Sequence, residues 1–199
     1  MDSIFIYLQL GFKHISDLAG FDHILFLVAL CAVYRIEQWR SLTVLVTAFT
    51  VGHSITLALS SFGTISIPSN VIEFLIPTTI LVTALHNVIG RPSVQTGATQ
   101  AGSAMAKNYA MALFFGFIHG MGFSNFFRAL LMREDSIVVP LLGFNLGIEI
   151  GQLMVVGVIV GVAFIFLNII GVKHRDWNVF VSGAAAGIAV LLMAENKFW

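Results

Sequence analysis

The sequence predicts an all-α fold, a polytopic transmembrane helical bundle of about six to seven membrane helices. The first observation is composition: the chain is 58% hydrophobic and only 10% charged, with 18 Phe and a mean hydropathy of +0.94. A water-soluble domain of 199 residues cannot bury that much apolar surface. The second is that polar residues divide the chain into apolar stretches of about the length needed to cross a bilayer core.

The apolar stretches define the expected helices in order. Residues 4–18 predict an interfacial or half-inserted helix, because their apolar part is shorter than a full span. The stretch 137–170 is too long for one straight span, so a tilted or interfacial turn is expected near Pro140. The six spans are expected at residues 20–34, 41–61, 70–89, 109–127, 137–170 and 177–194.

The chain is expected to form a single integral membrane domain over residues 1–199. Residues 90–108 are rich in small and polar types and predict a flexible loop between two three-helix halves. With six spans, six basic residues fall on one side of the membrane and four on the other, which makes the first side cytoplasmic by the positive-inside rule. The six are Arg35, Arg40, Arg91, Lys107, Lys173 and Arg175, and the four are Lys13, Arg128, Arg133 and Lys197.

Charge and cysteine content narrow the partners. Ten basic and ten acidic residues leave no net charge, so nucleic acid is not expected as a partner. The expected partners are the lipid bilayer and a small ligand. The single cysteine, Cys31, cannot form an internal disulfide and is expected to be a packed core thiol. No phosphate-binding glycine loop occurs, so ATP hydrolysis by this chain is not expected.

Glycines spaced four residues apart predict close helix packing. Phe-rich faces are expected to face lipid rather than to surround a ligand. The glycine repeats are Gly143, Gly147 and Gly151, then Gly116 with Gly120, and Gly183 with Gly187.

Ionisable side chains inside these apolar stretches indicate a functional site, because placing such groups in a membrane costs several kcal/mol. Imidazole and carboxylate groups of five segments are expected at one depth, near the outer face. Asp22 could instead cap a helix, and His53 and His119 could be core histidines bonded to carbonyls. The members of the set are His14, Asp22, His23, His53, Glu73, His119 and Glu149.

Two polar stripes accompany these groups. Asn145, Glu149 and Gln152 recur at i, i+4 and i+7, which places them on one helix face. Thr50 and Ser54, with Thr47, form a similar stripe beside His53, and both stripes are expected to face a shared interior. Interhelical hydrogen bonding is the favoured role of Asn145 and Gln152, whereas Glu73 could be a solvated helix start. His86 and Asn87, at the cytoplasmic end of their span, are expected to form a second station or an exit.

Four segments carry a resemblance to a known family. They are 11–26 (GFKHISDLAGFDHILF), 47–57 (TAFTVGHSITL), 115–123 (FGFIHGMGF) and 144–152 (FNLGIEIGQ), with Glu73 and Asn87 between the second and third. In this order they resemble the motifs of the HupE/UreJ family of bacterial nickel and cobalt permeases. His14 lies further from Asp22 than in the better-described members, and the motif at His119 is shorter, so the resemblance is to a sister branch.

The resemblance implies a multi-pass permease of the bacterial inner membrane that transports nickel, with cobalt as a second candidate. Imidazole and carboxylate ligands suit such divalent transition metals. We expect capture at the outer face by His14, Asp22 and His23, transfer to a midplane site of His53, His119 and Glu149, and release past His86 and Asn87. Glu73, Thr50, Ser54, Asn145 and Gln152 are expected to line the path or support the ligands.

A different class of protein fits part of the same pattern. Histidines and acids at one depth could hold a catalytic Zn²⁺ in an intramembrane hydrolase, with a water in the open coordination position. Ser54 could be proposed as a nucleophile, but it points about 100° away from His53 on the same helix. Metal analysis together with metal uptake separates the two classes. A homo-oligomer is compatible with either.

Overall fold

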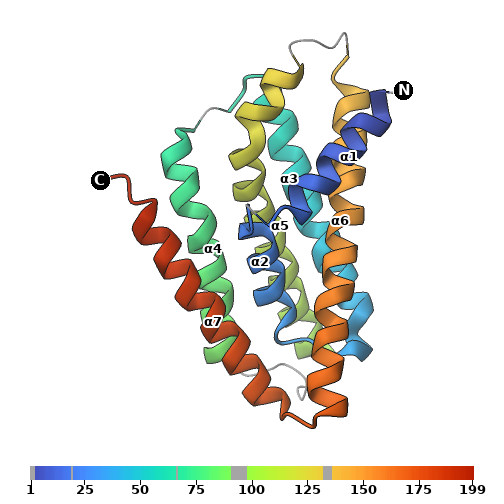
Figure 1. Cartoon of the computed structure of the whole chain (residues 1–199), viewed down its shortest axis with the longest axis vertical. Helices are drawn as coiled ribbons and strands as arrows, with labels where there is room; N and C mark the ends of the chain where they lie inside the picture. The colour runs from blue at the N-terminus through green and yellow to red at the C-terminus, as the bar shows by residue number, and fades with distance from the viewer. Residues whose placement is uncertain (1–2, 19, 66, 91–97, 132–135) are drawn as a thin grey trace.

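A computed structural model describes residues 3–18, 20–65, 67–90, 98–131 and 136–199, and the regular elements of these residues are all helices (Figure 1). The predicted all-α bundle is therefore confirmed. The helices are α1 (Ser3–Ser16), α2 (Asp22–Cys31), η1 (Ile36–Gln38), α3 (Trp39–Ser61), α4 (Ser69–Ile89), α5 (Ala98–Leu131), α6 (Val138–Phe164), η3 (Ile165–Ile169) and α7 (His174–Glu195).

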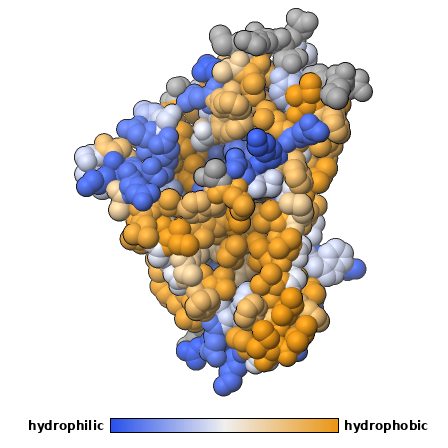
Figure 2. Space-filling view, in the orientation of Figure 1, coloured by the Kyte–Doolittle hydropathy of each residue, from blue (hydrophilic) through white to orange (hydrophobic). Residues whose placement is uncertain are grey.

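Among the described residues, five segments are long and apolar enough to cross a membrane. They lie along the long axis of the molecule in Figure 1, and its surface carries a broad hydrophobic area with polar patches toward both ends (Figure 2). In Figure 1, α3, α5 and α7 run toward the upper end, whereas α4 and α6 run toward the lower end. The segments are Ile36–Ser61, Ser69–Ile89, Met105–Leu131, Val138–Ile169 and His174–Glu195.

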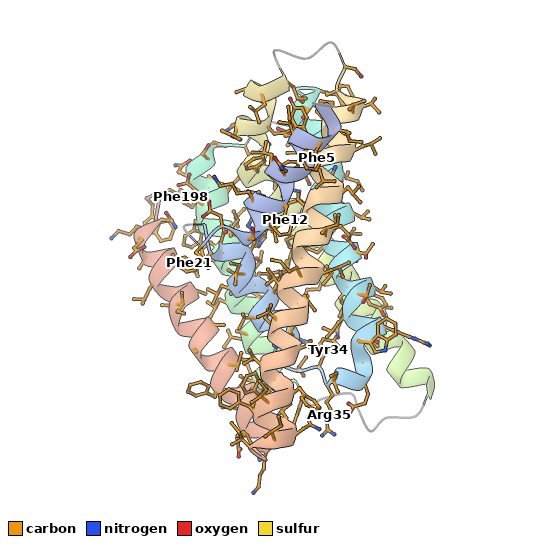
Figure 3. All side chains as sticks on the ribbon, turned by 45° about the vertical axis from the view of Figure 1, so that its right-hand side comes forward. Phe5, Phe12, Phe21, Tyr34, Arg35 and Phe198 are labelled. Carbon is orange, nitrogen blue, oxygen red and sulfur yellow. The ribbon has the colours of Figure 1, made fainter. Side chains whose placement is uncertain are left out.

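The first crossing is made by two short helices rather than by one span. The ten residues of α2 extend only about 15 Å, half the thickness of a bilayer core. Helix α1 occupies the upper half of the bundle, and Figure 3 follows the chain from Phe5 at the upper end to Tyr34 at the lower end. The single span predicted at 20–34 is therefore wrong, and the half-inserted helix predicted at 4–18 corresponds to α1. The helix is interrupted at Asp17 and Gly20, residue types that disfavour a helix.

Glycines let two pairs of helices pack with their backbones in contact. A Cβ atom on Gly11 or Gly147 would meet a backbone carbonyl oxygen across the α1–α6 interface, that of Phe144 or Leu8 respectively. On α5, a Cβ atom on Gly120 would lie 2.6 Å from the carbonyl oxygen of His53 on α3. The predicted packing role is thus confirmed for the glycines of α5 and α6. It is wrong for Gly183 and Gly187 of α7, whose Cβ positions have no described atom within 4 Å.

The ends of α5 and α6 differ from the prediction. Helix α5 begins at Ala98, so residues 98–108 are helical and not part of a loop, in keeping with the high helix propensity of their alanines. Residues 91–97, the rest of that predicted loop, lie outside the described residues. Helix α6 is regular around Pro140, which sits in its first turn, and the irregular part comes instead at its end, in the π-helical turn η3.

The main helix pairs are α1 with α6, α3 with α5, and α4 with α7. Each pair joins one helix that precedes residues 91–97 to one that follows them. The two predicted three-helix halves are therefore interleaved and share one core. This interleaving brings side chains from α1, α2, α3 and α5 to the middle of the bundle.

Candidate metal site

Four histidines from four helices meet at the break between α1 and α2. His14 stands near the end of α1 and His23 near the start of α2, and their ring centroids are 4.7 Å apart. The ring of His23 lies 6.0 Å from that of His53 on α3 and 5.0 Å from that of His119 on α5. One ring nitrogen from each of His14, His23 and His53 can be chosen so that all three lie within 4.8 Å of one another. We call these four side chains the histidine cluster.

The ring nitrogens of the histidine cluster are mostly without protein partners. Five of them are buried with no hydrogen-bond partner among the described residues: Nε2 of His14, Nε2 of His23, both nitrogens of His53, and Nδ1 of His119. A neutral imidazole offers one nitrogen lone pair, which is the form that ligates a metal. Buried polar atoms normally have partners, so five such atoms on neighbouring rings indicate a site built for a ligand. The three histidines whose ligand atoms lie within 4.8 Å of one another are His14, His23 and His53, and the ring of His119 lies beside that of His23.

Asp22 orients the ring of His23. Its Oδ1 lies 3.1 Å from Nδ1 of His23 and also accepts the backbone N–H of His23 at 2.9 Å. An ionised carboxylate only accepts hydrogen bonds, so Nδ1 carries the proton and Nε2 keeps the lone pair. The alternative role of Asp22 as a helix cap does not apply, because Phe21 is the N-cap residue of α2 and no side chain caps it.

Aromatic rings cover the histidine cluster on two sides along the bundle axis. Toward the upper end, Phe123 and Phe144 stack with their ring centroids 4.8 Å apart, and the ring centroid of Phe123 lies 4.1 Å from that of His14. Toward the lower end, Phe26 and Phe49 stack at 4.8 Å, and both contact His119. Phe26, Phe49 and Phe144 are fully buried, so the expectation that Phe faces lipid is wrong for them.

A cavity of about 190 Å³ lies beside Asp22, on the α4–α7 side of the break between α1 and α2. It is lined by Asp22, Glu73 and Asn196 together with Gly20, Phe21, Ile76, Pro77 and Leu192. Two carboxyl groups therefore stand beside the break between α1 and α2. None of the four clustered histidines lines this cavity, and Asp22, which is bonded to His23, stands between the cavity and the cluster.

The structure unites two stations that were predicted to be separate. His14, His23 and Asp22, expected at an outer capture site, contact the same cluster as His53 and His119, expected at the midplane. The reason is the position of α1, which fills the upper half of the crossing and so places the start of α2 inside the bundle (Figure 1).

The polar stripes of α3 and α6 bond to each other. Thr47 donates to Oε1 of Glu149 at 2.6 Å, and Thr50 donates to Oε1 of Gln152 at 2.6 Å. Thr47 precedes His53 by six residues, so the Glu149 contact lies about 9 Å along α3 from the histidine. Oε2 of Glu149, Oδ1 of Asn145 and Nε2 of Gln152 are buried without a partner among the described residues. The hydroxyl of Ser54 donates to the carbonyl of Thr50 at 2.7 Å and not to a histidine.

His86 and Asn87 occupy different environments on α4. His86 is exposed, whereas Asn87 is buried and donates to the carbonyl of Ala29 at 2.6 Å. Asn178 of α7 in turn donates to the carbonyl of Asn87 at 2.9 Å. Hydrogen bonds of Asn87 therefore connect α4 to both α2 and α7.

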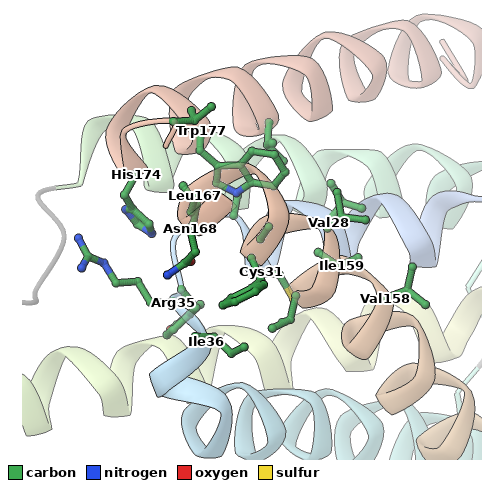
Figure 4. A pocket seen from close by; sticks show the side chains of 18 of the residues that line it. Val28, Cys31, Arg35, Ile36, Val158, Ile159, Leu167, Asn168, His174 and Trp177 are labelled. Atoms are coloured by element: carbon green, nitrogen blue, oxygen red, sulfur yellow. The ribbon is translucent and has the colours of Figure 1, made fainter. Parts of the chain in front are cut away.

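A larger cavity, of about 450 Å³, lies at the lower end of the bundle between α2, α6 and α7 (Figure 4). Its walls are mainly aliphatic, with Arg35, Asn168, His174 and Trp177 at one side. His174, predicted in a loop, is the first residue of α7 and half-buried. None of the four clustered histidines lines this cavity or the smaller one, so donor chemistry rather than cavity size marks the candidate metal site.

Two groups of site residues were not predicted from the sequence. Thr79 of α4 contacts His119 across 40 positions of sequence, and nothing in the local sequence signals that contact. The aromatic layers had a usable signal: Phe26, Phe49 and Phe123 lie three or four residues from His23, His53 and His119, on the same helix faces.

Membrane-length apolar helices around buried histidines and a carboxylate define the class, a multi-pass membrane protein with polar chemistry in its interior. A family model described as HupE / UreJ protein matches residues 1–197. The chain belongs to the HupE/UreJ family of nickel and cobalt transporters, and the predicted resemblance is confirmed. No curated protein and no solved structure was found to match the chain.

Proposed function

We propose that this chain is a permease that moves a divalent transition metal ion, nickel or cobalt, across the bacterial inner membrane through the histidine cluster. The observation that carries the proposal is the set of five buried ring nitrogens, without partners among the described residues, on neighbouring histidines of α1, α2, α3 and α5. Membership of a transport family supports movement of the ion rather than its permanent retention.

The donor set suits the proposed substrate. Imidazoles bind nickel, cobalt and zinc well, and the lone Cys31 lies in the hydrophobic core at a distance of eight residues from His23 on α2, so a soft thiolate site is not favoured. Imidazole ligands are neutral, and Asp22 supplies a negative charge beside them. An ion held by neutral ligands and one nearby carboxylate can also leave, which conduction requires.

The proposed path begins in the cavity beside Asp22 and Glu73. From there the ion passes to His23 and is held by His14, His53 and His119 between the two aromatic layers. Because Phe26 and Phe49 cover the cluster toward the lower end, release requires these rings to move. The unpartnered polar atoms of Glu149 and Gln152, and His86 further down, are the next polar stations in the proposal.

The proposal is tested by metal analysis of the purified protein combined with nickel and cobalt uptake into proteoliposomes. We expect concentration-dependent uptake that stops in the His53→Gln variant, with little metal retained after purification. Stoichiometric zinc in the protein with no flux of any metal would contradict the permease and favour the intramembrane hydrolase.

A further inference from the structure

Thr79 of α4 forms a hydrogen bond with the ring of His119 on α5. Oγ1 of Thr79 lies 2.9 Å from Nε2 of His119, and both side chains are buried, with 3% and 0% of their surface exposed. Thr79 stands two residues after Pro77, which lines the cavity beside Asp22. The contact therefore links the histidine cluster to the helix that forms one wall of the proposed entrance.

The hydrogen bonds of Thr79 fit one tautomer of His119. A hydroxyl group has one proton to donate, and that of Thr79 goes to the carbonyl oxygen of Ile76 at 2.7 Å. With its proton on that carbonyl, Oγ1 accepts a hydrogen bond from His119, and Nε2 is then the protonated nitrogen. In a neutral imidazole this leaves the lone pair on Nδ1, the nitrogen that is buried without a partner.

We propose that Thr79 is a positioning residue of the metal site, which holds His119 in the Nε2–H tautomer and thereby presents Nδ1 as its ligand atom. The inference rests on the proposed function and deepens it. Thr79 acts on His119 as Asp22 acts on His23, but through the opposite ring nitrogen: Asp22 frees Nε2 and Thr79 frees Nδ1. Groups bonded to a ligand's second nitrogen commonly change metal affinity by 10- to 100-fold.

The structure offers a matched control on the same helix. Thr83 is also buried, and its hydroxyl donates to the backbone carbonyl of Thr79 at 2.8 Å, within α4. Thr83→Val removes a buried hydroxyl of the same size without touching the bond to His119. Thr79→Ser keeps the hydroxyl and loses one methyl group, so it tests whether the oxygen atom is what matters.

The experiment measures the His119 tautomer and nickel affinity in the purified full-length protein. Long-range ¹H–¹⁵N correlation of ¹⁵N-histidine-labelled protein distinguishes the two neutral tautomers, and the His119→Gln spectrum assigns the signals. We expect His119 in the Nε2–H form in wild type, Thr79→Ser and Thr83→Val. In Thr79→Val we expect a mixture of tautomers and nickel affinity lower by about 10- to 100-fold.

An Nδ1–H tautomer of His119 in the wild type would overturn the role of Thr79 without touching the proposed function. Unchanged tautomer and affinity in Thr79→Val would do the same. Equal losses of affinity in Thr79→Val and Thr83→Val would also overturn it, because the effect would then be one of packing. Failure of the wild type to bind nickel at all would overturn the proposed function instead, and the tautomer measurement distinguishes that case because it needs no metal.

Discussion

Replacing His23 by glutamine is expected to abolish metal accumulation while leaving the protein folded and inserted. His23 is 4% exposed and lies within contact distance of His14, His53 and His119, so every proposed coordination geometry uses it. Glutamine keeps much of the size and hydrogen bonding of histidine, but its amide ligates a divalent transition metal poorly. Nickel uptake by cells, normalised to the amount of protein in the membrane, should fall at least about tenfold.

The matched control for this variant is His174→Gln. His174 is half-buried at the start of α7, near the lower end of the bundle and away from the histidine cluster. Its substitution is expected to leave uptake within about twofold of the wild type, because it removes no side chain of the cluster. Equal damage by both variants would mean that membership of the cluster does not decide function.

Replacing Gly147 by leucine is expected to prevent the bundle from assembling. A Cβ atom at this position would overlap the backbone carbonyl of Leu8 on α1, and a backbone atom cannot move aside as a side chain can. Overpacking of this kind costs about 1–3 kcal/mol or more, and here it also separates the helix that carries His14. We expect a large loss of monodisperse protein in size-exclusion chromatography of detergent extracts.

Gly183→Leu provides the control, because Gly183 also lies inside an apolar helix but no described atom is within 4 Å of its Cβ position. Both substitutions improve helix propensity by a similar amount, so the difference between them isolates the interhelical contact. The same yield from Gly147→Leu as from Gly183→Leu would show that α1 does not pack on α6 as described.

The helices that the sequence predicted well are those whose apolar stretch ends at a clear polar boundary. Helices α3 and α4 begin and end within two residues of the expected 41–61 and 70–89. The first crossing was predicted wrongly because α1 is too short to be recognised as a span, and its role depends on the glycine contacts with α6, which local sequence does not reveal. The start of α5 was missed because small residues suggested a loop while their alanines favour a helix.

The histidines of the candidate site could be selected from the sequence because ionisable groups are rare in apolar segments. Their expected depth in the membrane did not show which of these side chains contact one another. His14 joined the cluster because the break after α1 brings it to His23, and Glu149 bonds to Thr47 because its face of α6 turns toward the α3 stripe. Thr79 has no local signal, since a buried threonine in an apolar helix usually bonds to its own backbone.

X-ray absorption spectroscopy of the nickel-loaded protein tests the central claim most directly, because it reports the ligands of the bound ion. The histidine cluster predicts at least three imidazole nitrogens at about 2 Å, recognised by multiple scattering from their rings, with fewer in His53→Gln. A first shell of oxygen atoms without imidazole scattering, unchanged by His53→Gln, would contradict the assignment of the metal to this cluster.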